Sequence, residues 1–185
     1  MTCIVGLVDN GDVYLGADSA GAGGTFIETR LDPKVFLLKN MAIGYTSSFR
    51  MGQLLQYALK VPEQGEQSDM EFLVTTFADA VRELFRTRGF LWKQNDREEG
   101  GVFLIAYRGC LYSMEADFQI VQHAHAYAAC GCGRELALGA MYATQEDEHP
   151  ELRISTALSA AAEFSCAVRG PFRIVKLPKA STNTA

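Results

Sequence analysis

Thr2 is the residue whose side chain and position together suggest a reactive group. Its side chain is small enough to permit removal of Met1, which would expose a hydroxyl and a free α-amine on one residue. An unperturbed α-amine has a pKa of about 7.7–8.0, so it can accept the hydroxyl proton close to neutral pH. We therefore predict that Thr2 is a nucleophile that carries its own base.

A predicted β-hairpin at the start of the chain positions Thr2. The residues after Thr2 are largely apolar and β-branched, and Asn10-Gly11 is typical of a two-residue turn between antiparallel strands. With these two residues at the centre of the turn, Cys3 falls opposite Asp18, so Asp18 lies near Thr2. Side chains alternate along a strand, and an unbroken ladder would put Asp18 on the opposite face from Thr2. The hairpin predicts proximity and leaves orientation open.

The remaining pattern is a grouped order of strands and helices. Alternating or continuous apolar segments predict strands over 25–30, 34–38, 41–47, 101–107, 110–116, 118–128 and 172–177. Helical spacing predicts helices over 49–59, 69–87, 134–144 and 152–167. Strands and helices that come in groups favour an α+β fold, with helices segregated on layered sheets, over an alternating parallel fold.

The length and composition favour one domain. The chain has 185 residues, of which 48% are hydrophobic, so it can bury a full core without disulfides or metals. We expect a single domain over residues 1–178 and a flexible C-terminal tail over residues 179–185.

The charge pattern excludes two classes of partner. The chain has 17 basic and 22 acidic residues, a net charge of −5, and no basic run, which argues against nucleic acid. Its N-terminus lacks a charged leader, and no apolar run reaches the roughly 18 residues that cross a membrane. The five cysteines are an odd number in a chain that needs no disulfide. We therefore expect a cytoplasmic protein.

Three residues at regular spacing resemble those of a known family. Thr2, Asp18 within GADS and Lys34 within DPKVFLL follow one another at intervals of 16 residues. Taken singly, Asp18 could shape a turn and Lys34 could be a solvated charge at a strand edge. Their joint spacing, order and strand context resemble the proteasome β-subunit family, and within it the bacterial HslV-type proteolytic subunit. The segments 131–141 and 161–172 resemble later parts of the same family.

The resemblance implies a fold and a catalytic group. The fold is the four-layer αββα sandwich of the N-terminal nucleophile hydrolases, with Thr2, Asp18 and Lys34 as the catalytic threonine, aspartate and lysine. Lysine titrates near about 10.4, so Lys34 would stay cationic and favour the Thr2 alkoxide, while Asp18 would hold Lys34 in place. In GYTSS (44–48), the backbone N–H of Ser47 would bind the oxyanion.

The chain departs from the family pattern at several supporting positions. Ser47 stands where the family usually has glycine. Cys132 stands where the family has a serine beside the catalytic threonine, and Glu163 and Cys166 approximate a late acid and hydroxyl. A thiol is a weaker hydrogen-bond partner than a hydroxyl, so these departures bear on activity more than on fold.

The resemblance also implies the biological context. A threonine peptidase of this family needs no cofactor and cleaves peptides or unfolded polypeptides inside a homo-oligomeric ring. Because the chain has no Gly-rich phosphate loop, a separate ATPase would supply unfolding. Two alternatives stay open: a catalytically weak assembly subunit of the same fold, which the cysteine substitutions favour, and a non-peptidase amidohydrolase.

A metal site is a further alternative for two short motifs. Cys130-Gly-Cys132 offers two thiols, and His123-Ala-His125 would place two imidazoles on one face of a strand. Neither motif has the paired spacing of a structural zinc site. Small core thiols and strand-surface histidines are the interpretation that the spacing favours.

Overall fold

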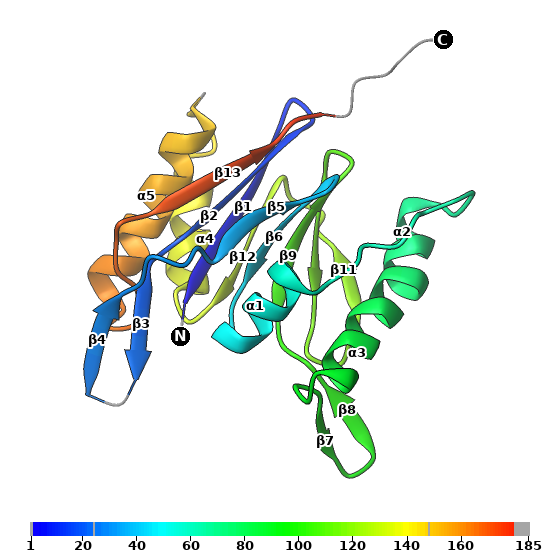
Figure 1. Ribbon diagram of the computed structural model, residues 1–185. Helices are drawn as coiled ribbons and strands as arrows, with labels where there is room; N and C mark the ends of the chain where they lie inside the picture. The colour runs from blue at the N-terminus through cyan, green and yellow to red at the C-terminus, as the bar shows by residue number, and fades with distance from the viewer. Residues whose placement is uncertain (1, 24, 148, 180–185) are drawn as a thin grey trace.

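Two antiparallel sheets pack face to face between two layers of helices (Figure 1). The computed structural model describes residues 2–23, 25–147 and 149–179. The first sheet has the strand order β12-β1-β2-β13, and the second has the order β11-β10-β9-β6-β5. This arrangement has the α+β, four-layer αββα architecture that the sequence predicts.

The strands of the first sheet are β1 (Cys3–Asp9), β2 (Asp12–Ala17), β12 (Tyr127–Gly131) and β13 (Arg173–Leu177). Those of the second sheet are β5 (Val35–Leu38), β6 (Met41–Tyr45), β9 (Phe103–Tyr107), β10 (Cys110–Met114) and β11 (Ile120–Gln122). Two small hairpins pair β3 (Ala20–Gly23) with β4 (Phe26–Thr29), and β7 (Trp92–Gln94) with β8 (Arg97–Glu99).

The helices cover the outer faces of the two sheets. The first sheet carries α4 (Arg134–Ala143) and α5 (Pro150–Phe164). The second carries α1 (Phe49–Tyr57), α2 (Asp69–Phe72) and α3 (Ala78–Thr87), with a π-helical turn over Leu73–Phe77 between the last two. No helix in the described ranges is both long and apolar enough to cross a membrane.

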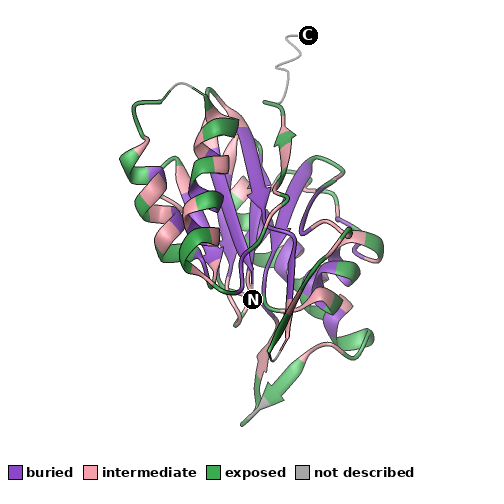
Figure 2. Ribbon diagram, turned by 90° about the vertical axis from the view of Figure 1, so that its left-hand side faces the viewer, coloured by how far each residue is buried: buried purple, intermediate pink, exposed green. Residues whose placement is uncertain are grey.

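Each central strand is buried on both faces, which explains its nearly continuous apolar sequence. Along β1, Ile4 lies between the sheets, whereas Val5 and Leu7 pack against α4 and α5. Along β9, Leu104 faces the other sheet and Ile105 faces the α1–α3 layer. Figure 2 shows this as a buried centre between half-exposed helices. The strand alternation therefore divides the apolar side chains among three interior layers.

The structure corrects the prediction of one strand over 118–128. Strand β11 ends at Gln122, and β12 begins at Tyr127 as a neighbour of β1 in the other sheet. The chain between them crosses from one sheet to the other, so His123 and His125 lie in a connection rather than on one strand face. The alternation of apolar and polar residues runs on through 118–128, so the sequence pattern alone does not report the change of sheet.

Strand β4 lies within the strand predicted over 25–30, but its partner β3 and the β7–β8 hairpin were not predicted from the sequence. The β7–β8 hairpin overlaps the segment 93–101, whose many charged residues indicate a polar loop rather than strands. Asn95 and Asp96 form its turn, with φ values of 48° and 63°. Strand β3 is rich in glycine and alanine and carries little strand signal. Both hairpins project from the layered body (Figure 1).

The predicted tail largely lies outside the described residues. Its first residue, Lys179, is described and donates its backbone N–H to Asp12 Oδ1 at 2.8 Å. Residues 180–185 and Met1 fall outside the described ranges.

Candidate active site

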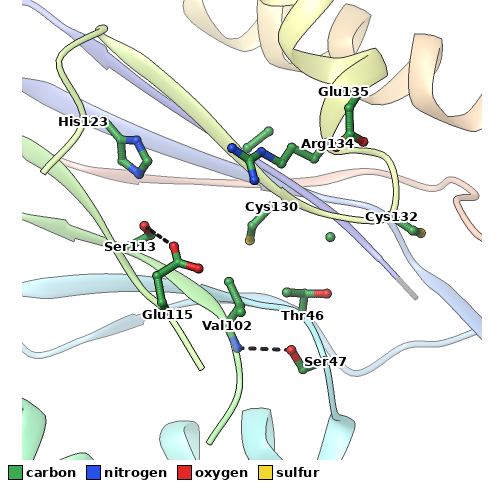
Figure 3. Close-up of a pocket in the computed structure, with 12 residues that line it drawn as sticks. Thr46, Ser47, Val102, Ser113, Glu115, His123, Cys130, Cys132, Arg134 and Glu135 are labelled. Carbon is green, nitrogen blue, oxygen red and sulfur yellow. Dashed lines mark hydrogen bonds between the residues drawn. The ribbon is translucent and has the colours of Figure 1, made fainter. Parts of the chain in front are cut away.

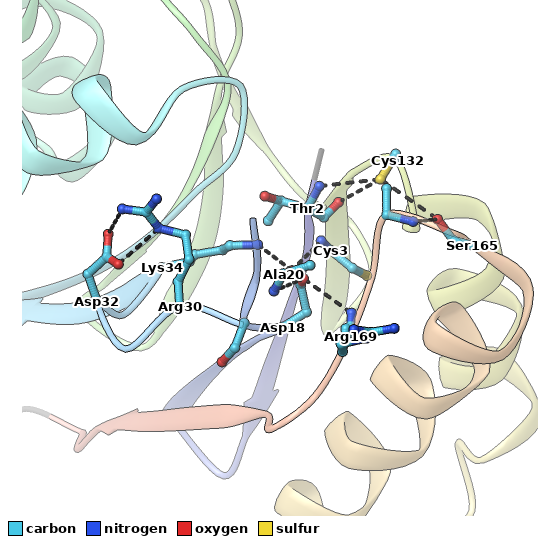
Figure 4. A network of polar contacts seen from close by, with 12 residues as sticks. Thr2, Cys3, Asp18, Ala20, Arg30, Asp32, Lys34, Cys132, Ser165 and Arg169 are labelled. Carbon is cyan, nitrogen blue, oxygen red and sulfur yellow. Dashed lines mark hydrogen bonds and ion pairs between the residues drawn. The ribbon is translucent and has the colours of Figure 1, made fainter. Parts of the chain in front are cut away.

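The Asp18 carboxylate is the centre of a buried polar network at the end of the first hairpin (Figure 4). Its Oδ1 accepts the backbone N–H of Cys3 and a proton of Lys34 Nζ, both at 2.9 Å. Its Oδ2 accepts the backbone N–H of Ala20 at 2.8 Å and that of Arg169 at 3.5 Å. Four donors from separate segments therefore hold one carboxylate in a single orientation.

The end of the β1–β2 ladder explains how Asp18 comes to face this network. The regular register runs from Asp9↔Asp12 to Ile4↔Ala17, so the next pair is Cys3 and Asp18, as the turn predicts. Asp18 donates its own N–H to the Cys3 carbonyl over 3.3 Å, but the Cys3 N–H is bound by the Asp18 carboxylate. The Asp18 carboxylate therefore takes the place of a backbone carbonyl as the acceptor of the Cys3 N–H, and the Asp18 side chain points toward Cys3. This local break settles the orientation that strand alternation left open.

Lys34 lies immediately before β5 and reaches Asp18 through the interior. The side chains of both residues are fully buried, and their charged atoms form an ion pair at 2.9 Å. Burial lowers the pKa of Lys34, and the Asp18 charge and hydrogen bond oppose that shift. The Lys34 carbonyl accepts the N–H of Tyr45, which ties the start of β5 to β6. Lys34 is thus a positioned interior cation and not a solvated charge.

Thr2 lies directly before β1 and is only 4% exposed. Its backbone N–H donates to Cys132 Sγ at 3.3 Å, and the Cys132 thiol donates to the Thr2 carbonyl at 3.4 Å. Because Cys3 N and Lys34 Nζ bind the same Asp18 oxygen, the ammonium lies close to the Thr2–Cys3 peptide. Figure 4 shows Thr2 between Lys34 and Cys132. The three residues predicted from spacing are therefore brought together.

Gly131 allows Cys132 to approach Thr2. Its φ of 94° lies in the region that favours glycine, and a Cβ there would collide with the Thr2 carbonyl oxygen. Cys3 pairs with Gly131 across the β1–β12 ladder, so the chain leaves the sheet directly beside Thr2. The sharp turn after β12 is what places the Cys132 thiol on the Thr2 backbone.

Ser165, and not Cys166, is the residue after α5 that extends this network. Ser165 Oγ lies 3.9 Å from Cys132 Sγ and accepts the N–H of Ala167 at 3.4 Å. Cys166 and Glu163 are both exposed. The sequence alone predicts Cys166 instead of the preceding residue, Ser165. The sequence at the end of a helix does not indicate which of two small polar side chains points inward.

Ser47 has the backbone conformation expected of a residue that presents its amide. Its φ is 69°, a region that favours glycine, and it follows directly on Thr46 after β6. Its Oγ accepts the N–H of Val102 at 3.1 Å. That bond turns the side chain toward Val102, which explains how serine is accommodated where glycine is usual.

A cavity of about 450 Å³ is lined by residues that neighbour Thr2, although Thr2 itself is not one of the lining residues (Figure 3). The lining includes Gly131 and Cys132, which lie against the Thr2 backbone, and Ser47. Glu115 and His123 line it on the side away from Cys132 (Figure 3). A space large enough for part of a substrate therefore lies next to residues that contact the candidate nucleophile.

The other cysteines and histidines do not form a metal cluster among the described residues. Burial, reinforced by the Asp18 charge, raises the pKa of the Cys3 thiol to about 12, and burial raises that of Cys130 further. His125 stacks on Tyr127 at a ring distance of 5.6 Å. Cys3 and Cys130 are therefore unreactive core thiols.

Solved structures with the same fold are similar to this chain along nearly its whole length. BPH from Thiobacillus denitrificans in complex with epoxomicin matches with a TM-score of 0.81 and 18% identity, over 96% of this chain and 98% of that chain. Eukaryotic HslV from Trypanosoma brucei matches with a TM-score of 0.71 and 17% identity, over 94% and 98%. A mutant of Anbu from Hyphomicrobium sp. strain MC1 matches with a TM-score of 0.66 and 12% identity, over 95% and 80%.

These matches confirm the fold of the proteasome-type N-terminal nucleophile hydrolases. The HslV match has a lower TM-score than the BPH match, so the fold does not single out an HslV-type subunit. No protein-family model and no curated protein sequence matches the chain.

Proposed function

We propose that this chain is a threonine peptidase, with Thr2 as its nucleophile once Met1 is removed. The observation that carries the proposal is the fully buried Lys34–Asp18 ion pair next to Thr2. Burying an ammonium costs free energy unless a partner compensates it. A lysine held in this way, beside a residue that can supply both a hydroxyl and an α-amine, suits activation of that hydroxyl.

The proposed reaction follows from the positions of these groups. The free α-amine of Thr2 takes the Oγ proton as Oγ bonds to the substrate carbonyl carbon. The C–N bond then breaks, and the proton passes to the leaving amine, which leaves an acyl ester on Thr2. Water attacks the ester carbon and gives a proton to the α-amine. The bond between Oγ and the acyl carbon then breaks, the α-amine returns the proton to Oγ, and a carboxylic acid is released. The Lys34 charge stabilises the alkoxide, and Asp18 holds that charge in place.

A backbone N–H and a thiol support the proposed transition state. The Ser47 N–H donates no hydrogen bond within the described ranges and lies at the cavity rim, where it can bind the oxyanion. Cys132 contacts the nitrogen of Thr2 that would become the α-amine. The thiol would thereby orient the base, as a positioning residue.

We further propose that the peptidase works as a homo-oligomeric ring on peptides or unfolded polypeptides, with a separate ATPase for folded substrates, in the cytoplasm. The resemblance to the proteasome β-subunit family supports this assembly. Exposed apolar side chains such as Tyr57 and Leu37 on the α1 and β5 side offer contact area. Light scattering that shows only a monomer at micromolar concentration would refute the ring.

The test is covalent labelling by epoxomicin, the compound bound to the structurally similar BPH. Intact-mass and peptide mass spectrometry should show loss of Met1 and one adduct on Thr2. Thr2→Ala should abolish the adduct, and Lys34→Met should slow its formation by about a hundredfold or more, as loss of a preorganised charge does elsewhere. Lys39→Met, at a half-exposed lysine, is the matched control and should label normally.

The outcomes separate the peptidase from a structural subunit. Assembled protein that carries no adduct in any form, with Met1 retained, would refute the peptidase and leave an assembly role. Unchanged labelling of Lys34→Met would refute the role assigned to Lys34.

A further inference from the structure

The cavity beside Thr2 contains an unpaired carboxylate. Glu115 accepts one hydrogen bond, from Ser113 Oγ to its Oε1 at 2.9 Å. Within the described ranges, Glu115 Oε2 accepts no hydrogen bond, and no lysine or arginine forms an ion pair with Glu115. Ser113 is 3% exposed, and Glu115, which is half-buried, lines the cavity next to it. A partly desolvated carboxylate of this kind favours a cationic partner.

His123 adds a second unsatisfied group to the same wall. Its Nε2 is buried and has no hydrogen-bond partner among the described residues. Burial lowers the pKa of His123, with Arg134 adding to the shift and Glu115 opposing it, so the ring is neutral near neutral pH. A neutral imidazole has one acceptor nitrogen. Figure 3 shows its ring on the same side of the cavity as Ser113 and Glu115.

The remaining charges lie at the start of α4. Arg134 and Glu135 both line the cavity and are both exposed. Arg134 forms no ion pair with Glu115 in the described part of the chain. Glu115 and Glu135 outnumber Arg134, and a neutral His123 adds no charge, so the lining carries a net charge of −1. The cavity therefore favours a cation over an anion.

We propose that this cavity binds a basic side chain of the substrate, arginine or lysine, with Glu115 as its counter-ion. The assignment of this side chain to a substrate rests on the proposed peptidase function. The guanidinium or ammonium donates to Glu115 Oε2, and the buried Nε2 of His123 is a second acceptor when the imidazole proton is on Nδ1. Ser47, Gly131 and Cys132 at the other end of the cavity connect this site to Thr2. The peptidase would thus prefer peptides with a basic residue close to the cleaved bond.

A binding measurement tests the site without any catalytic step. The probe is Nα-acetyl-arginine amide, and Nα-acetyl-citrulline amide is its uncharged match. Calorimetric titration of Thr2→Ala protein should show the arginine probe binding about tenfold or more tightly than the citrulline probe, as expected for a charge-assisted pair. Glu115→Gln, which keeps an acceptor for Ser113, should abolish this ratio. Glu146→Gln, beyond the far end of α4, is the matched control and should preserve it.

A substitution of Arg134 should change the affinity for the arginine probe in the opposite direction. Arg134→Gln removes from the lining a positive charge that repels the arginine probe. It should tighten binding of the arginine probe severalfold, with little effect on the citrulline probe. An equal ratio of affinities in the parent and Glu115→Gln proteins would overturn the proposal. Tighter binding of Nα-acetyl-glutamate amide than of the arginine probe would overturn it as well, in favour of an anion site at Arg134.

Peptide hydrolysis then links the site to the reaction. For paired peptides that differ only by arginine or citrulline next to the cleaved bond, kcat/KM should favour arginine about tenfold or more, and Glu115→Gln should remove this preference. Selective arginine binding without epoxomicin labelling would refute the peptidase and leave the cation site. Labelling without arginine selectivity would refute the cation site and leave the peptidase.

Discussion

Asp18→Asn should destabilise the protein more than Lys34→Met, although the two substitutions break the same ion pair. Lys34 contributes one of the four hydrogen-bond donors to Asp18, and the three backbone donors remain in Lys34→Met. Loss of one charge-assisted bond costs about 1.5–3 kcal/mol. The substitution also removes the cost of burying an ammonium, so we expect a loss of about 1–3 kcal/mol.

Asp18→Asn leaves the buried ammonium without a countercharge. Breaking a buried pair from one side costs about 3–5 kcal/mol. The amide NH₂ in place of Oδ2 would also face the backbone N–H groups of Ala20 and Arg169. We therefore expect a loss of about 4–6 kcal/mol. Asp18→Asn with Lys34→Met should recover part of that loss, because no unpaired charge remains.

Urea unfolding followed by circular dichroism measures these free energies, and pH provides an internal check. Burial already lowers the pKa of Lys34, and Asp18→Asn removes the carboxylate charge, which is the largest effect that opposes this shift. The unfolded Asp18→Asn chain then binds more protons than the folded one between the lowered pKa and the ordinary value of about 10.4. Its stability should rise with pH through that window more than the parent's does. A larger loss in Lys34→Met than in Asp18→Asn, or a double variant no more stable than Asp18→Asn, would refute the reasoning.

Two further predictions use matched pairs of residues near and away from the site. Gly131→Ala should lower the free energy of unfolding by more than about 2 kcal/mol, because Gly131 has a positive φ and a Cβ there would collide with the Thr2 carbonyl. Gly139→Ala on α4, where a Cβ meets open space, should raise the free energy of unfolding by about 0.5–1 kcal/mol. Thermal and urea unfolding measure both effects, and equal effects would contradict the prediction. Ser165→Ala should slow epoxomicin labelling severalfold while Cys166→Ala leaves it unchanged, since only Ser165 lies against Cys132; the reverse order would return the supporting role to Cys166.

The local part of the site could be predicted from the sequence. The Asn10-Gly11 turn sets the register of β1 and β2, and register alone places Asp18 opposite Cys3. The apolar strands between turns likewise indicate layered sheets, because a strand buried on both faces has few polar positions. Turn geometry and side-chain alternation depend on neighbouring residues, so both are visible in the sequence.

The direction of the Asp18 side chain was decided by the tertiary structure. Its carboxylate is held by the N–H of Arg169, which is 151 residues away, and by Lys34 from the other sheet. Hydrogen bonds between distant segments leave no periodic trace in the sequence. The same reason explains why Ser165 was missed and why Glu163 was expected to take part.

The cavity and its charge also depend on the tertiary structure alone. Glu115 and His123 follow different strands of the second sheet, and Arg134 begins a helix on the first. The chain passes from one sheet to the other between Gln122 and Tyr127, a crossing that the strand-like pattern of 118–128 concealed. Burial and charge pairing at a site depend on which segments meet there. Segment types and the hairpin register were determined locally, whereas the packing of the two sheets determined which polar groups were buried together beside Thr2.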